Sequence, residues 1–378
     1  MKKKNKKLHF EPTIFRDWSI AYCELAQISA TQEFKKQFGW RYTDLIFGWD
    51  GKKETLYRAI EEHIHGMFNF MKMRIKKDRG FIKQISSTLL KNIKEYQKLV
   101  EGWLNLDFKK ADKQEILAIF SQLKAKYLPL LPRFLIIMYF PQQLELYYQD
   151  YKEKLKRGNA ICLKTRPQVD KILAPLTEEV LRKIGSYALQ KVGFKNYDKF
   201  GRFLTIEEIE NLLTSAYSKA QISKLKEKLY KRRKYFLFAD GKVRLTPLKT
   251  YLKSRKWELI EHGAESGTRM VKGMPTYIVK RFIKGKVKIV ENKEELHKIQ
   301  KGDVIIAPMT TPEYAPIFRK VSAIVTDEGG ITCHAAIVSR ELRVPCIVGT
   351  KIATRIFQDN DYVEVNTRKG EIKLLKRK

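Results

Sequence analysis

The sequence predicts a multidomain protein of the α and α/β classes, in which a mostly helical domain precedes a compact α/β domain. Apolar residues recur three and four positions apart through residues 1–260, and this spacing places them on one face of a helix. The helical spacing ends near residue 263, where glycines become frequent. Short apolar runs between turn residues follow, and such runs are typical of strands.

Six segments of the first domain have the helical pattern. They are residues 17–38, 56–76, 81–104, 104–128, 177–193 and 205–216. Asp112 and Thr205 each stand three residues before a glutamate, which is the spacing of a capping box at a helix start. The apolar run of residues 128–141 is shorter than the roughly 20 residues that a membrane-spanning helix needs. It therefore predicts a buried helix.

Four strands and a closing hairpin are predicted in the second domain. They are residues 284–291, 302–309, 322–327 and 345–350, with the hairpin at 362–375. Turn residues around Asn366 and Gly370 indicate the hairpin loop. We expect one short helix after Thr311 and Pro312, and another after Thr332.

The change in pattern sets the domain limits. We place the helical domain at residues 1–262, a linker at 263–271 and the α/β domain at 272–378. The four cysteines include no C-x-x-C pair, so neither a zinc site nor a disulfide framework is expected. No apolar run follows the basic start of the chain, which argues against a signal peptide and favours a cytoplasmic protein without membrane contact.

The chain is strongly basic, with 76 Lys and Arg against 42 Asp and Glu, a formal net charge of +34. Such a charge bears on partners rather than on fold. The segment 219–256, called the basic segment below, contains fourteen Lys or Arg and two Asp or Glu. Its charges fit a solvated helix face, a docking surface for an acidic protein, or a nucleic-acid site. In the last case Tyr230, Tyr235, Phe236 and Phe238 would stack on bases.

The stretch GGITCHAAIVSREL, residues 329–342, places a histidine after two glycines, a threonine and a cysteine. We expect Thr332 to cap a helix and His334 to lie in its first turn. Gly329 and Gly330 allow a sharp backbone turn. The N–H groups of a first helical turn attract anions and keep an imidazole neutral. The arrangement suits a nucleophilic histidine that accepts a phosphoryl group, although an incidental histidine at a helix start has the same local pattern.

Residues 326–349 closely resemble the phosphohistidine signature of phosphoenolpyruvate-utilising enzymes. That family includes phosphoenolpyruvate synthase, pyruvate phosphate dikinase, Enzyme I of the sugar phosphotransferase system and rifampin phosphotransferase. The matching residues are Asp327, Gly329, Gly330, Thr332, Cys333, His334, Ala335, Ala336, Arg340, Pro345, Val348 and Gly349. The resemblance covers roughly 272–378. It implies a swivelling β/β/α domain in which His334 is transiently phosphorylated.

The resemblance also gives the neighbours of the histidine a supporting role in a phosphate cradle. These are Gly329, Gly330, Thr332, Cys333 and Arg340. Arg340 is expected either to pair with Asp327 or Glu341, or to approach the phosphoryl group during transfer. Asp327 is expected to be a turn and cap residue, and Cys333 is not expected to act as a catalytic thiol.

In the synthase and dikinase an ATP-grasp domain and a phosphoenolpyruvate-binding barrel accompany the swivelling domain, and neither pattern is visible here. Residues 199–213 and 228–236 are similar to the segment before the swivelling domain of rifampin phosphotransferase. The resemblance thus implies a phosphotransferase component with a separate ATP-grasp donor, and a helical domain that binds a small acceptor or docks a partner. ATP and Mg²⁺ would belong to the donor, and this chain is expected to hold no metal or cofactor. The alternative is a non-catalytic module whose basic helical region binds nucleic acid or an acidic protein.

Overall fold

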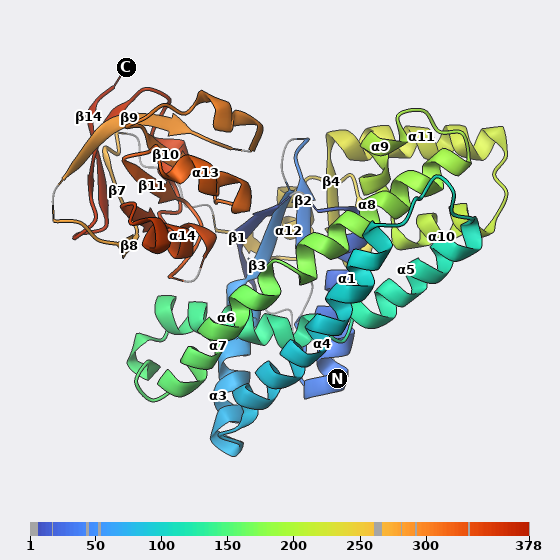
Figure 1. Ribbon diagram of the computed structural model, residues 1–378, viewed down its shortest axis with the longest axis horizontal. Coiled ribbons are helices and arrows are strands. Elements are labelled where there is room, and N and C mark those ends of the chain that lie inside the picture. The colour runs from blue at the N-terminus through green and yellow to red at the C-terminus, as the bar shows by residue number, and fades with distance from the viewer. Residues whose placement is uncertain are drawn as a thin grey trace. The chain divides into compact units, whose positions relative to one another are not determined.

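The computed structural model describes residues 7–16, 18–42, 45–51, 54–260, 267–280, 282–291, 293–331 and 333–377. Contacts divide the chain into two units, each described by itself below. Unit 1 comprises Met1–Gln143 and Tyr151–Ile260, and unit 2 comprises Leu144–Asp150 and Glu261–Lys378. In Figure 1 the colours blue to yellow follow unit 1, and orange and red follow most of unit 2.

Unit 1 is mostly helical, as predicted. Its α-helices are α1 (Ile20–Ile28), α2 (Phe34–Phe38), α3 (Met67–Lys77), α4 (Phe81–Leu104), α5 (Lys113–Tyr127), α6 (Leu131–Leu146), α7 (Lys156–Asp170), α8 (Leu173–Lys191), α9 (Tyr197–Phe200), α10 (Ile206–Thr214), α11 (Lys219–Lys234) and α12 (Leu248–Ser254). Two π-helical segments, Ser29–Glu33 and Ile60–Gly66, join α1 to α2 and β3 to α3.

The predicted caps of unit 1 are present. The Asp112 carboxylate accepts a hydrogen bond from the Glu115 N–H at 2.8 Å. Thr205 and Glu208 form the reciprocal capping box at the start of α10. The apolar run at 128–141 lies mainly in α6, where Ile136 has no exposed surface, so the predicted buried helix is confirmed. Within the described ranges, no helix is long and apolar enough to cross a membrane.

The described part of unit 1 also contains a six-stranded sheet that the apolar pattern did not predict. Its strands are β1 (His9–Arg16), β2 (Ile46–Trp49), β3 (Glu54–Ala59), β4 (Phe236–Ala239), β5 (Lys242–Arg244) and β6 (Glu258–Leu259), in the order β5-β4-β2-β3-β1-β6. β3 takes the first residues of the helix predicted at 56–76, and β4 and β5 lie in the basic segment. Strands from both ends of the unit pair here (Figure 1). Pairing with strands that are distant in the sequence outweighs the local helical preference of these residues.

Unit 2 contains all the strands predicted for the second domain. Its elements are β7 (Met270–Lys272), β8 (Met274–Tyr277), β9 (Ile283–Ile289), β10 (Val304–Ala307), α13 (Ala315–Phe318), β11 (Ala323–Thr326), α14 (His334–Leu342), β12 (Cys346–Val348), α15 (Ala353–Ile356), β13 (Tyr362–Asn366) and β14 (Glu371–Lys376). β7 and β8 were not predicted. β7 includes the last residues of the predicted linker, whereas residues 261–266 lie outside the described ranges.

The strands of unit 2 form one sheet in the order β7-β14-β13-β9-β10-β11-β12-β8. β9 to β12 run parallel, and β13, β14 and β7 continue the sheet as antiparallel neighbours. Val304 and Ile306 of β10 pack with the antiparallel strands, and Ile305 and Ala307 pack with α13 and α14. The parallel strands are therefore covered by helices on one face and by strands on the other, which confirms the β/β/α architecture.

Candidate functional site

His334 is the first residue of α14, in the first turn as predicted. The cap, however, is Cys333 and not Thr332. Cys333 has an extended backbone, and its Sγ accepts from the Ala336 N–H at 3.4 Å. The prediction for Thr332 as the cap is wrong because the helix begins one residue later than that role requires. Thr332 itself lies outside the described residues.

The two glycines before the helix differ in what the structure demands of them. Gly329 has φ +116°, and a Cβ there would lie 2.7 Å from Cys333 Sγ. Both its backbone angle and the available space therefore require glycine. A Cβ at Gly330 would meet none of the described atoms within 4 Å. The Gly330 carbonyl accepts from the Cys333 N–H at 2.9 Å, which closes the turn into α14.

A threonine that the sequence analysis did not single out orients the histidine ring. Thr310 is buried just beyond β10, and its Oγ1 lies 3.0 Å from His334 Nδ1. The ring is half-buried, with its centroid 6.1 Å from that of Phe318. In the tautomer with the proton on Nδ1, the Nδ1–H group donates a hydrogen bond to Thr310 Oγ1. The lone pair of Nε2 is then the nucleophile. The signal in the sequence was that Thr310 is a polar residue directly after the strand predicted at 302–309.

Asp327 is a structural residue of the turn after β11, as predicted. Its Oδ1 accepts from Thr350 Oγ1 at 3.0 Å and from the Thr354 N–H at 3.2 Å. Burial raises the pKa of this carboxyl, although these hydrogen bonds oppose the rise. Arg340 is exposed and, within the described ranges, makes no ion pair with Asp327 or Glu341. The two expected roles of Arg340 both stay predictions, and the Asp327 oxygens are bonded to Thr350 and Thr354.

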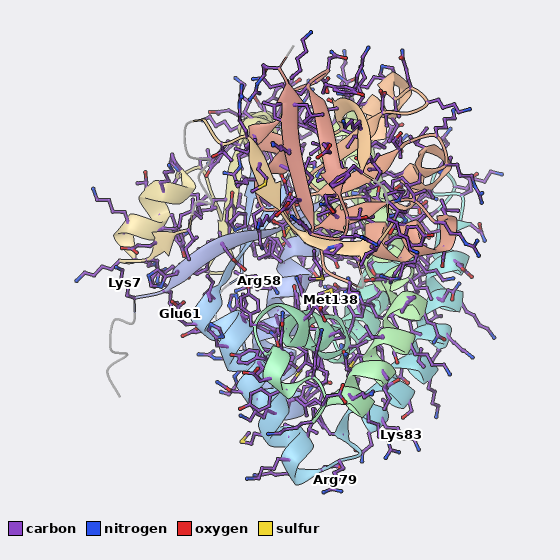
Figure 2. All side chains as sticks on the ribbon, turned by 90° about the vertical axis from the view of Figure 1, so that its left-hand side faces the viewer. Lys7, Arg58, Glu61, Arg79, Lys83 and Met138 are labelled. Carbon is purple, nitrogen blue, oxygen red and sulfur yellow. The ribbon has the colours of Figure 1, made fainter. Side chains whose placement is uncertain are left out.

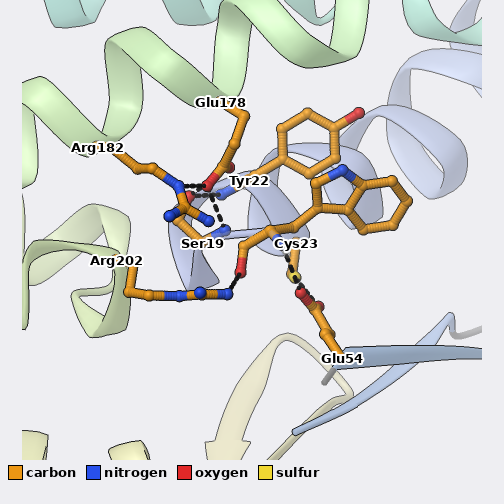
Figure 3. Close-up of polar contacts among 8 residues, drawn as sticks. Ser19, Tyr22, Cys23, Glu54, Glu178, Arg182 and Arg202 are labelled. Atoms are coloured by element: carbon orange, nitrogen blue, oxygen red, sulfur yellow. Dashed lines mark hydrogen bonds and ion pairs between the residues drawn. The ribbon is translucent and has the colours of Figure 1, made fainter. Parts of the chain in front are cut away.

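Unit 1 holds a second cluster of polar side chains, which is buried and was not predicted (Figure 3). Glu178 of α8 accepts from the Ser19 N–H and from Ser19 Oγ, each at 2.8 Å. It also accepts from Arg182 Nε at 2.6 Å. Burial raises the pKa of Glu178 even beside this guanidinium. These bonds join α8 to the start of α1.

The same cluster extends to Glu54 of β3. Glu54 accepts from Cys23 Sγ at 2.7 Å and from the Trp18 N–H at 3.0 Å, and Arg202 donates to the Trp18 carbonyl at 2.9 Å. Burial raises the pKa of Glu54 to about 8 and also raises that of the Cys23 thiol. A buried, protonated thiol is inert. The buried carboxylates of Glu54 and Glu178 therefore hold β3, α1 and α8 together and are closed to a substrate. Arg182 of the same cluster is partly exposed.

The described part of the chain contains no group of three or more His, Cys, Asp or Glu side chains that could hold a metal ion.

The aromatic side chains of the basic segment are mostly not placed to stack on bases. Phe236 and Phe238 are 1% exposed and belong to the core, because all four positions of β4 are buried. Arg232 is buried too, and it donates to Glu208 Oε2 at 2.5 Å. Of the proposed stacking residues, Tyr230 remains well exposed.

Comparison with known proteins identifies the region around His334. Residues 299–370 match the family model of the PEP-utilising enzyme, mobile domain. The probable phosphoenolpyruvate synthase of Archaeoglobus fulgidus is 39% identical over 175 residues, which are 45% of this chain and 22% of that protein. The phosphoenolpyruvate synthase of Pseudomonas aeruginosa is 34% identical over 206 residues, 50% of this chain and 26% of that protein. The resemblance of unit 2 to the mobile domain is thus confirmed.

The chain spans about a quarter of the length of these two synthases. Among solved structures, a solution structure of Enzyme I aligns with 78% of this chain and 81% of its own, at 14% identity and a TM-score of 0.22. A likeness of that size carries no argument about function.

Proposed function

We propose that unit 2 is a phosphoryl carrier, in which His334 takes a phosphoryl group from an ATP-dependent donor outside this sequence and passes it to a small-molecule acceptor. The observation that supports this proposal is the position of His334. It begins α14, its Nδ1 faces Thr310 Oγ1 at 3.0 Å, and it lies within the residues that match the mobile domain.

The chemistry of the step follows from this geometry. The Nε2 lone pair attacks phosphorus, a new N–P bond forms, and the bond from phosphorus to the donor oxygen breaks. Nδ1–H meanwhile donates to Thr310 Oγ1, which stabilises the positive charge that develops on the ring. The dipole of α14 favours the negative charge of the bound phosphoryl group. We assign ATP and the Mg²⁺ that bridges its phosphates to the donor.

The acceptor would bind in unit 1 under this proposal. A groove of about 410 Å³ lies there along α8, within the roughly 300–1,000 Å³ typical of small-molecule sites. Phe108 and Tyr187 supply apolar surface. The cations Lys109, Arg182 and Lys183 outnumber the two carboxylates of the lining, which are Asp107 and Glu179. Such a lining suits an acceptor that has a flat apolar part and an anionic group.

The test is phosphorylation of the purified chain. Labelled ATP with an ATP-grasp donor protein, or phosphoramidate as a chemical donor, should give an acid-labile and base-stable phosphoprotein. His334→Ala should lose this label, whereas the matched variant His297→Ala, in the same unit, should keep it. Label that persists in His334→Ala would contradict the proposal. Label obtained with ATP and the chain alone would place the donor within this sequence instead.

A further inference from the structure

The antiparallel strands β9, β13, β14 and β7 of unit 2 have one face on the core and one on solvent, and the solvent side is called the outer face below. Exposure alternates along β9 and the residue before it, so that Phe282, Lys284 and Lys286 point outward while the residues between them are buried. Figure 2 shows the orange and red strands of this unit, with their side chains as sticks.

Strand register places an aromatic ring of the outer face between two lysines. Tyr362 of β13 pairs with Lys286 of β9 on one side and with Lys376 of β14 on the other. Neighbouring strands lie about 4.8 Å apart, so both ammonium groups are within reach of an anion beside the ring. The Tyr362 side chain is 40% exposed, and it is therefore accessible as a stacking surface.

The outer face has an excess of positive charge. Its acidic side chains are already paired, Glu364 with Lys284 at 3.7 Å and Glu371 with Lys272 at 3.0 Å. Three further lysines of the face make no ion pair with any described residue. They are Lys286, Lys373 and Lys376.

The outer face is also rich in exposed apolar surface. Ten large hydrophobic side chains are exposed among the described residues, and four of them lie on this face or at its edge. They are Met270, Phe282, Tyr362 and Leu375. Such a concentration indicates a binding surface rather than scattered exposure.

We propose that the outer face binds single-stranded nucleic acid. Phe282 and Tyr362 lie four residues apart in the register of β9 and β13, roughly 13 Å along the strands, which suits bases that stack on both rings. The lysines between and beside the rings would contact the phosphates. A flat sheet surface cannot enter the major groove, so unstacked single strands fit it better than a duplex.

Two further observations favour nucleic acid over an acidic protein. Lysine is depleted in protein–protein interfaces, whereas here three unpaired lysines surround the exposed apolar side chains. The net charge of +34 also attracts a polyanion over a long range. The proposal is independent of phosphoryl transfer, because α14 packs on the opposite face of the parallel strands, in a separate core.

The experiment is an anisotropy titration of the full chain with labelled oligouridine and oligothymidine of about twelve nucleotides. Lys286→Glu combined with Lys376→Glu should weaken binding at least about tenfold, and log K should fall with log salt by about 0.7 per phosphate contacted. Tyr362→Ala should weaken binding about tenfold, whereas Tyr362→Phe, which keeps the stacking ring, should stay within about twofold. Thermal unfolding checks that each variant is folded.

The matched control is Lys224→Glu with Lys226→Glu, which reverses two exposed lysines of α11 in the basic segment and should leave binding within about twofold. Equal loss in both double variants, or loss in the α11 variant alone, would overturn the proposal. A wild-type chain that binds neither oligonucleotide would also overturn the proposal.

Full competition by polyglutamate, together with unchanged binding by Tyr362→Ala, would show that the outer face binds an acidic protein instead. Tighter binding of oligouridine than oligothymidine would assign the site to RNA, and equal binding would assign it to either single strand.

Discussion

His334 in unit 2 and Glu178 in unit 1 are both polar groups held by hydroxyl-bearing side chains, yet their surroundings differ. His334 is half-buried in the first turn of α14, and the Thr310 hydroxyl lies 3.0 Å from its Nδ1. Glu178 is buried, and donors from Ser19 and Arg182 surround its carboxylate. A group that reacts with a substrate must keep an atom accessible, whereas a group that joins elements of the fold has its oxygens occupied. The three predictions below test this distinction.

The largest effect is expected at Glu178. Glu178→Ala leaves the Arg182 guanidinium and Ser19 without their buried partner, and removal of one member of a buried ion pair costs about 3–5 kcal/mol. Urea unfolding followed by tryptophan fluorescence measures this free energy. Glu179→Ala, the exposed neighbour on the same helix, should change it by no more than about 0.5 kcal/mol. Similar free energies of unfolding for the two variants would show that the Glu178 contacts do not stabilise the fold.

The pH dependence of unit 1 tests the same region through its protonation. Burial raises the pKa of Glu54 from 4.5 to about 8 and that of Glu24 to about 7. Between these values and 4.5 the folded chain holds protons that the unfolded chain has lost. The free energy of unfolding therefore falls as pH rises from about 4.5 through 8.

Thermal unfolding of the wild type from pH 5 to pH 9 measures this decline. Glu54→Gln keeps the shape of the side chain but cannot ionise, so it should flatten most of the slope. A variant with the wild-type slope would mean that Glu54 is already ionised in its buried site.

The smallest effect is expected at Thr310. Thr310→Val removes the partner of His334 Nδ1 and should slow phosphorylation by phosphoramidate about tenfold, since a hydrogen bond to a charged group is worth about 1.5–3 kcal/mol. Thr310→Ser should restore most of the rate, and Thr311→Val, the adjacent control, should leave it unchanged. An unchanged rate in Thr310→Val would show that the ring is oriented by other contacts.

Sequence reasoning predicted unit 2 well, because its strands are compact apolar runs separated by turn residues. It predicted unit 1 less completely. β3 was assigned to a helix because Leu56 and Ile60 fit a helical spacing, and its neighbours in the sheet lie far away in the chain. Glu178 and its partner Ser19 are 159 residues apart, so no local pattern connects them.

The same limits apply to the site. The position of His334 in the first turn of α14 followed from the glycines and the apolar helix after it. The capping residue was misplaced by one position, since Thr332 is a better capping residue than Cys333 by preference alone. Thr310 lies 24 residues before His334, and only the return of the chain through β11 brings the two together.

Both faces of β10 and its neighbour β11 are buried, and this slows the exchange of their amide hydrogens with solvent. The amides of Ile305 and Ile324 are bonded within the sheet and covered on both faces, so they exchange only when the whole of unit 2 opens. The turn at Gly329 and Gly330 lies outside these ladders, and its amides exchange through local openings that leave the strands closed.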